Sequence, residues 1–367
     1  MKLTSVAVYQ VNLPFDGGVY QLSGGREWTG MDSTIVKLET DQGVVGWGET
    51  CPFGANYLQA FAEGARQGIA ELAPSILGRD PSKPSQMYEV MDRNMLGHPY
   101  VKHAIDMACW DILGKLADVP LFSLLGGRRI DRVQSAGGIP LAAGELQTNK
   151  MALHRKNGCR QFSTKASGNA ESDIELLIKL GEKLQPQESI KVDANRGWRV
   201  DEAIRVMHAT SHIDLYFEQP CETYEECRAV HRAYGRPIIL DECALTLDTV
   251  VQGWNEGVCN ALNLKIGRVG GLTPALRIRN LCAALRIPFY IQCAGGNDLT
   301  QAAIVNLAHS SAPELVLGIW DIGDLCRFNT CENPLSREDG YMWANDAPGL
   351  GVEPSMATLG EPEMVFS

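Results

Sequence analysis

Apolar and polar positions follow different periods in the two parts of this chain. Residues 1–50 alternate, with a turn signal at Asp41-Gln42-Gly43, and predict an antiparallel meander. Residues 58–125 carry apolar positions at helical spacing, so helices are expected there. From Val133 onward, short β-rich runs alternate with helical segments, which is typical of a parallel sheet. The expected strands lie near 133–138, 159–165, 189–195, 213–219, 236–241, 259–266, 287–292 and 316–320.

About eight parallel strands separated by helices predict closure into a barrel. The fold class is therefore predicted to be α/β, a modified TIM-type (β/α)7β barrel with an N-terminal α+β capping domain. The capping domain is expected at 1–125 and the catalytic barrel at 126–324. A loop-rich segment of about 325–367 is expected to return to the capping domain. The length of 367 residues allows this division.

Five charged residues close five successive apolar runs of the barrel region, at intervals of 28, 25, 23 and 24 residues. One strand, one helix of about three turns and two short loops use roughly that length. The C-terminal ends of barrel strands share one face, so the five charges are expected to converge on one site. They are Lys165, Asp193, Glu218, Asp241 and Lys265.

The three carboxylates among these five predict a metal site. Asp193, Glu218 and Asp241 would repel one another at neighbouring strand ends unless a cation neutralised them. Oxygen ligands select a hard divalent ion, and few ligands with open positions favour Mg²⁺ over Ca²⁺. The alternative interpretation is three surface carboxylates that cap helices, and the regular spacing argues against it.

The two lysines flank the carboxylate strands, one strand before them and one strand after them. A metal and a second cation depress the pKa of an amine, so Lys165 and Lys265 are candidate acid/base catalysts. Glu242 is expected to form an ion pair with Lys265 and orient it. Asn195 is expected to support the metal ligands from behind.

Charge and composition exclude several classes of partner. A net charge of −11 argues against binding to nucleic acid or to an anionic membrane. No stretch approaches the roughly 18 apolar residues of a membrane span. The N-terminal sequence reads as a strand rather than an export signal, so the protein is expected to be cytoplasmic, with its 11 cysteines reduced.

The chain resembles the enolase superfamily, in its muconate-lactonizing-enzyme subgroup, over essentially its whole length. The resemblance rests on VDAN with Asp193, FEQP with Glu218, LDE with Asp241 and LKIGRVGGLT with Lys265. It implies that magnesium binds a substrate carboxylate, a lysine removes the α-proton, and the metal stabilises the enediolate. Members of the subgroup usually carry Lys-x-Lys on the second strand, where this chain has Ser163-Thr164-Lys165.

Within the superfamily, the capping segments 21–30 and 51–57 look most like those of cis-3-hydroxy-L-proline dehydratases, then 4-hydroxyproline betaine 2-epimerases. The resemblance implies dehydration or 2-epimerisation of a hydroxyproline-like amino acid. It also implies a substrate site that includes Ser163 and the aromatic faces of Tyr57 and Trp320, although ordinary packing explains both aromatics equally well. Gln292 and Cys293 stand where relatives commonly have a carboxylate for the substrate amine.

Other functions remain open from the sequence. They are racemisation of N-substituted amino acids, proline betaines or dipeptides, cycloisomerisation of a diacid, and a non-catalytic barrel that only binds a ligand. A diacid would need cationic capping loops, where only Arg26 is evident. A hydrolase barrel would need His ligands, which the strand ends lack. The resemblance also implies a homo-oligomer with an even number of subunits.

Overall fold

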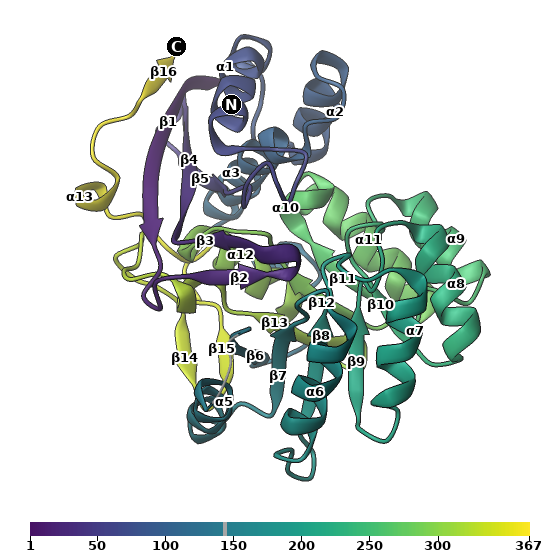
Figure 1. Cartoon of the computed structure of the whole chain (residues 1–367). Helices are drawn as coiled ribbons and strands as arrows, with labels where there is room; N and C mark the ends of the chain where they lie inside the picture. Colours follow the sequence, from purple (N-terminus) through teal and green to yellow (C-terminus); the bar gives the residue numbers. More distant parts are fainter. Residues whose placement is uncertain (142–144) are drawn as a thin grey trace.

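The computed structural model describes residues 1–141 and 145–367. An antiparallel sheet with three helices lies against the open end of a parallel barrel, as Figure 1 shows. In the part of the chain described, no helix is both long and apolar enough to cross a membrane.

The capping sheet is antiparallel, with the strand order β16-β1-β4-β5. Its strands are β1 (Leu3–Pro14), β4 (Gly30–Thr40), β5 (Val45–Thr50) and β16 (Met364–Phe366). The helices that follow are α1 (Ala62–Ile76), α2 (Pro84–Asn94) and α3 (Pro99–Ala117). A buried apolar cluster between this sheet and these helices forms the core of the capping domain.

Eight parallel strands form the barrel, and the pairing of the last strand with the first closes it. They are β6 (Val133–Ile139), β7 (Gln161–Lys165), β8 (Ser189–Asp193), β9 (Leu215–Glu218), β10 (Ile238–Leu240), β11 (Ala261–Lys265), β12 (Phe289–Gln292) and β13 (Val316–Trp320). The predicted fold class is confirmed.

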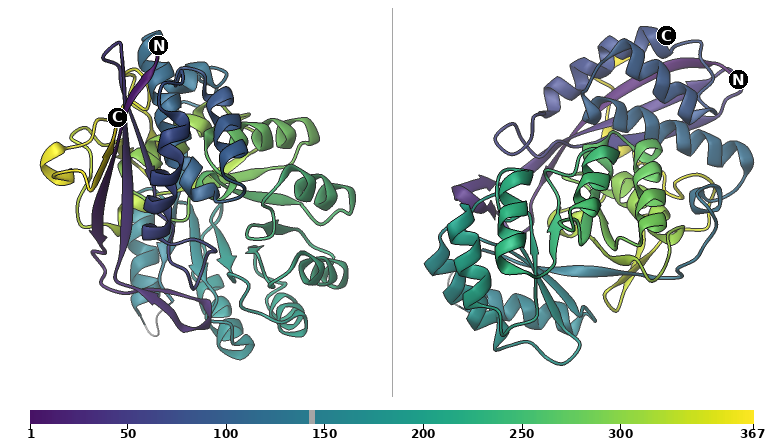
Figure 2. Two further views of the ribbon diagram at one scale, coloured as in Figure 1. Left: turned by 90° about the horizontal axis from the view of Figure 1, so that it is seen from above. Right: turned by 90° about the vertical axis from the view of Figure 1, so that its right-hand side faces the viewer.

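Helices connect successive strands and surround the barrel, as the views of Figures 1 and 2 show. They are α5 (Leu146–Lys156), α6 (Ala170–Gly181), α7 (Val200–Ala209), α8 (Tyr224–Tyr234), α9 (Leu247–Asn255), α10 (Ile266–Val269), α11 (Leu272–Leu285) and α12 (Asp298–His309). Two short helices, α4 (Leu121–Leu124) and α13 (Met356–Leu359), lie outside this alternation.

The segment after β13 contacts both parts of the molecule. It begins with a short 3-10 helix, η2 (Ile322–Leu325). The hairpin of β14 (Ser336–Glu338) and β15 (Tyr341–Trp343) then pairs with β6 of the barrel. Strand β16 returns to β1 of the capping sheet, so the two chain termini lie near each other (Figure 1).

A small hairpin of the capping domain is fastened to the mouth of the barrel. It comprises β2 (Tyr20–Leu22), the turn η1 (Ser23–Gly25) and β3 (Arg26–Trp28). The Ser23 hydroxyl lies 2.6 Å from the carbonyl oxygens of both Ala166 and Ala194, which follow β7 and β8. The hairpin therefore has a fixed position above the strand ends.

Two buried carboxylates join the capping domain to barrel helices. Glu49 of β5 accepts hydrogen bonds from the backbone N–H groups of Asn297 and Thr300 at the start of α12. Asp106 of α3 accepts from the backbone and hydroxyl of Thr273 at the start of α11. Carboxylates stabilise helix N-termini because they accept from free N–H groups and complement the helix dipole.

Burial of His103 on α3 predicts a loss of stability in acid. Neither ring nitrogen has a hydrogen-bond partner within the described ranges, and burial lowers the pKa of His103 to about 3. Between the ordinary value of 6.5 and about 3, the unfolded chain binds a proton that the native state does not. Stability is therefore lost as the pH falls through this window.

We expect His103→Leu to reduce this acid sensitivity. The loss in free energy of unfolding between pH 7.5 and pH 5 should be about 2 kcal/mol smaller than in the wild type. Urea unfolding at the two pH values measures the difference. The control is His208→Gln on α7, where the side chain is exposed. An equal acid-induced loss in wild type and His103→Leu would contradict the prediction.

Candidate active site

The two candidate acid/base lysines lie on opposite sides of the barrel. Lys165 ends β7 and Lys265 ends β11, and three strands separate β7 from β11 in either direction around the closed barrel. Both side chains line the same cavity. The strand order therefore lets the two ammonium groups approach a bound molecule from opposite sides.

The three carboxylates come from the consecutive strands that separate the lysines on one side. Asp193 of β8 is the register partner of Glu218 of β9, and Asp241 directly follows β10. All three are buried, with exposed fractions of 3%, 0% and 0%. Their arrangement places three negative charges side by side in a site with little solvent.

Each carboxylate contacts a cation of the chain. Lys165 Nζ lies 2.6 Å from Asp193 Oδ2, and Lys265 Nζ lies 2.6 Å from Asp241 Oδ2. Arg268 forms a second ion pair with Asp241. Glu218 pairs with Lys191 and accepts a hydrogen bond from Asn263 Nδ2 at 2.5 Å. The buried charges are therefore paired, as burial requires.

These contacts shift the pKa values of the paired groups. Burial alone would raise the pKa of Asp193, but the neighbouring ammonium groups, Lys165 first, lower it to about 2. Burial opposes the charge of Lys165 and Lys265, yet the carboxylates of Asp193 and Asp241 raise both lysine pKa values. Burial raises the pKa of Glu218, and the like charge of Asp193 raises it further.

The donor chemistry of the carboxylate group fits a hard divalent cation. The ligands offered are all oxygens, and like-charge repulsion raises the pKa of the central Glu218. Two buried amide oxygens beside them, Asn195 Oδ1 and Asn263 Oδ1, have no hydrogen-bond partner within 1–141 and 145–367. Among these described residues no three His, Cys, Asp or Glu side chains form a ready-made metal site, because the three carboxylates face cations of the chain. Asp193, Glu218 and Asp241 as metal ligands stay a prediction.

The predicted ion pair between Lys265 and Glu242 is wrong. Lys265 pairs with Asp241, whereas Glu242 Oε1 accepts from Asn195 Nδ2 at 3.2 Å and lies 4.0 Å from Arg196 Nε. Successive residues at a strand end point in different directions, so Asp241 and Glu242 face different neighbours. Asn195 donates its backbone N–H and its side-chain amide to Asp193, and its role in supporting a metal ligand stays a prediction.

Tyr57 contacts Lys265 through its hydroxyl group. Its hydroxyl accepts hydrogen bonds from Lys265 at 3.2 Å and Arg268 at 3.1 Å, and Arg26 and Arg196 lie near its ring. Burial raises the pKa of Tyr57 to about 12. The phenol therefore stays protonated and helps to position Lys265.

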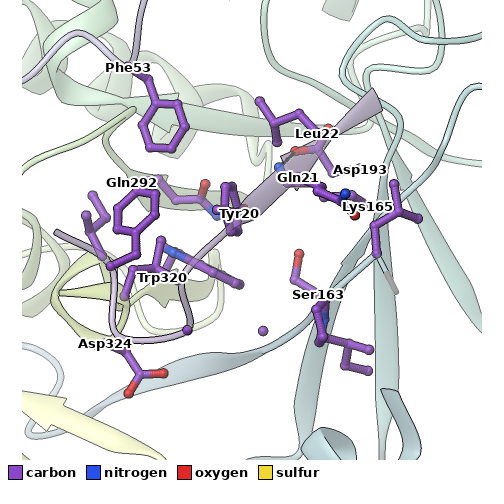
Figure 3. Close-up of a pocket in the computed structure, with 18 of the residues that line it drawn as sticks. Tyr20, Gln21, Leu22, Phe53, Ser163, Lys165, Asp193, Gln292, Trp320 and Asp324 are labelled. Carbon is purple, nitrogen blue, oxygen red and sulfur yellow. Dashed lines mark hydrogen bonds and ion pairs between the residues drawn. The ribbon is translucent and has the colours of Figure 1, made fainter. Parts of the chain in front are cut away.

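A cavity of about 360 Å³ lies between the strand ends and the capping hairpin (Figure 3). Both lysines and Asp193 line it. All five residues expected to contact substrate also line it: Tyr57, Ser163, Gln292, Cys293 and Trp320. The capping domain contributes an apolar wall that includes Phe15, Tyr20 and Phe53, whose rings pack together.

Three site residues were missed from the sequence, namely Lys191, Asn263 and Arg268. Lys191 and Asn263 stand two positions before Asp193 and Lys265, so they point into the barrel from the same faces of their strands. A polar residue two positions before a charged strand end predicts a second polar side chain on the same face, and this pattern could have identified Lys191 and Asn263. Arg268 lies in the short helix α10, and no sequence period points to its role.

The comparisons with known proteins agree with this fold. Residues 145–358 match the enolase C-terminal domain-like family. Residues 29–126 match the mandelate racemase / muconate lactonizing enzyme N-terminal domain. The chain therefore belongs to the mandelate racemase / muconate lactonizing enzyme group of the enolase superfamily, and it is an enzyme of that superfamily.

The similar proteins include a named dehydratase and a named racemase. The chain is 40% identical to cis-3-hydroxy-L-proline dehydratase of Roseibium aggregatum over 100% of both chains. It is 24% identical to N-succinyl-L-Arg/Lys racemase of Bacillus cereus over 98% of both. A solved enolase-superfamily member from Roseovarius nubinhibens, complexed with magnesium, is 35% identical with a TM-score of 0.94 and covers 100% of this chain and 99% of that one.

Proposed function

We propose that this enzyme removes the α-proton of a hydroxyproline-like amino acid with the help of Mg²⁺, and then releases water or returns a proton on the opposite face. The observation that carries the proposal is the placement of Lys165 and Lys265 on opposite sides of the barrel, with three buried carboxylates on the strands between them. This arrangement gives each face of one carbon its own proton carrier.

The carboxylates would hold the metal. Asp193, Glu218 and Asp241 are the proposed ligands, and a magnesium ion bound there would supply positive charge for the carboxylate of the substrate. A cation at these oxygens competes with Lys165 for Asp193 and with Lys265 for Asp241. Metal loading would therefore weaken the two ion pairs that raise the lysine pKa values, so that one lysine can lose its proton and serve as the base while the other remains an ammonium.

The lysines would then carry the proton chemistry. One lysine takes the α-proton, and the electron pair of that C–H bond forms a double bond between the α- and β-carbons. The β-hydroxyl leaves as water with a proton from a lysine ammonium, so atoms and electrons balance. Return of a proton to the α-carbon by the opposite lysine would give epimerisation instead.

The cavity wall supports a small amphipathic substrate. The rings of Phe15, Tyr20 and Phe53 can cover the carbon skeleton and exclude water. Gln292 and Cys293 carry no charge, but Asp324 lies on the wall near Trp320 (Figure 3). A substrate ammonium would thus find its negative partner on that side of the cavity.

Dehydration is favoured over the other superfamily reactions by the full-length similarity to a cis-3-hydroxy-L-proline dehydratase. The second candidate is 2-epimerisation of an N-substituted amino acid, which the neutral pair Gln292-Cys293 favours. Cycloisomerisation of a diacid is disfavoured because Arg26, the evident cation of the capping hairpin, donates to the carbonyl oxygens of Ser23 and Asn195.

Incubation with Mg²⁺ in deuterated water tests this function. We expect cis-3-hydroxy-L-proline to lose water and recovered substrate to carry deuterium at the α-carbon. The panel should include 4-hydroxyproline betaine and N-succinylated amino acids, with mass spectrometry and NMR as readouts. Exchange only with the N-substituted compounds would favour the second candidate. Absence of exchange with every proline analogue would remove the hydroxyproline proposal.

A further inference from the structure

Lys191 is a buried cation that the proposed chemistry leaves without a role. Its side chain is 4% exposed, and its ammonium pairs with Glu218 and lies 4.7 Å from the centre of the Tyr290 ring. An ammonium is costly to bury, and an apolar side chain of similar length would fill the same space more cheaply. Its position therefore indicates a need for the charge itself.

The strand register places this charge beside the residue where relatives carry an extra lysine. Ser163 of β7 is the register partner of Lys191 of β8, just as Lys165 is the partner of Asp193. Residues two apart on a strand share a face, so Ser163 and Lys191 form the layer directly beneath Lys165 and Asp193. Both line the cavity, and the Ser163 hydroxyl points into it in Figure 3.

Counting charges shows what the ammonium of Lys191 does. Three carboxylates, one divalent ion and Arg268, which pairs with Asp241, carry no net charge together. Lys191 adds one positive charge for an incoming substrate carboxylate without using Lys165 or Lys265, the two groups needed for proton transfer. The ion pair with Glu218 also limits the directions in which that carboxylate can turn.

We propose that Lys191 is a positioning residue that replaces, from the neighbouring strand, the second cation missing at Ser163, and so gives the metal-loaded carboxylate group a positive charge for an anionic substrate. This inference rests on the proposed function. Moving the charge to β8 leaves the small Ser163 at the cavity surface, where a lysine would occupy space.

Charge relocation tests the proposal. The variants are Lys191→Met, which removes the charge, Lys191→Arg, which keeps it, and S163K/K191M, which moves it to β7. The surface variant Lys183→Met is the control, because Lys183 is exposed. Isothermal calorimetry gives the Kd for Mg²⁺ alone, and deuterium exchange gives KM and kcat for the substrate found above.

Loss of the Lys191 charge is expected to strengthen Mg²⁺ binding and to weaken substrate binding. Lys191→Met should bind Mg²⁺ about tenfold more tightly, because one positive charge near the ligands is lost. The same variant should show a KM about tenfold higher, with a smaller change in kcat. Lys191→Arg should keep the Mg²⁺ Kd within about threefold of wild type, and S163K/K191M should return both Kd and KM towards it.

Two results would overturn the proposal. One is an unchanged Mg²⁺ Kd in a folded Lys191→Met protein. The other is recovery in Lys191→Arg but not in S163K/K191M, since a role in local packing depends on position 191 whereas an added positive charge can be moved. If the wild type exchanges no proline analogue, the proposed substrate fails, but the calorimetric comparison still decides the role of Lys191.

Discussion

Replacing Lys165 or Lys265 with alanine is expected to lower turnover by about 100- to 10,000-fold while leaving the fold intact. Each lysine ends a strand on its own side of the cavity, so neither can replace the other at the same face of a substrate. The fold should remain intact because the carboxylate that loses its lysine still has another hydrogen-bond or ion-pair partner. Asp193 still accepts from Asn195, and Asp241 still pairs with Arg268.

Steady-state kinetics with cis-3-hydroxy-L-proline and Mg²⁺ measures the effect. The matched control is Lys183→Ala, which removes an exposed lysine between α6 and β8. Circular dichroism and thermal unfolding show whether each variant is folded. A folded Lys165→Ala or Lys265→Ala enzyme with turnover within tenfold of the wild type would refute its role as a proton carrier.

Removal of the metal or of its central ligand is expected to have the second large effect. EDTA should abolish turnover and added Mg²⁺ should restore it, because the carboxylates then hold Lys165 and Lys265 in ion pairs. Glu218→Gln should weaken Mg²⁺ binding by about 100-fold or more, since the middle of three negative ligands becomes neutral. Calorimetry at pH 8 measures the affinity directly.

The controls separate loss of the ligand from loss of the fold. Glu175→Gln removes an exposed carboxylate of α6 and should bind Mg²⁺ like the wild type. Glu218→Gln also loses its ion pair with Lys191, so its folding needs a separate check by circular dichroism. Wild-type affinity for Mg²⁺ in a folded Glu218→Gln protein would rule out the proposed ligand set.

Both predictions concern residues that the sequence analysis had already identified as candidate site residues. The apolar runs that end at Lys165, Asp193 and Lys265 become β7, β8 and β11, each ending at the charged residue. This succeeded because a strand, a helix and their loops occupy a nearly constant length, so equal spacing of charges becomes equal placement around a barrel. The family resemblance added the binding of a substrate carboxylate by the metal and the shared first step.

The sequence was less informative about which groups meet. It paired Lys265 with Glu242, whereas in the structure Lys265 pairs with Asp241 and Arg268 contacts the same carboxylate. It did not indicate that the Tyr57 hydroxyl contacts both Lys265 and Arg268. Such contacts depend on side-chain directions at strand ends and on the docking of the capping domain, which no local period encodes.

The sequence by itself determined the barrel, the capping domain and the row of charged strand ends, because these follow from periods of about two and 3.6 residues and from repeat length. Only the tertiary structure decided that Lys191 lies beside Ser163 and pairs with Glu218, and that Glu49 and Asp106 hold the capping domain on the barrel. The physical reason is that these contacts join residues distant in the chain. Strand register, barrel closure and the alternation of side chains between faces bring them together.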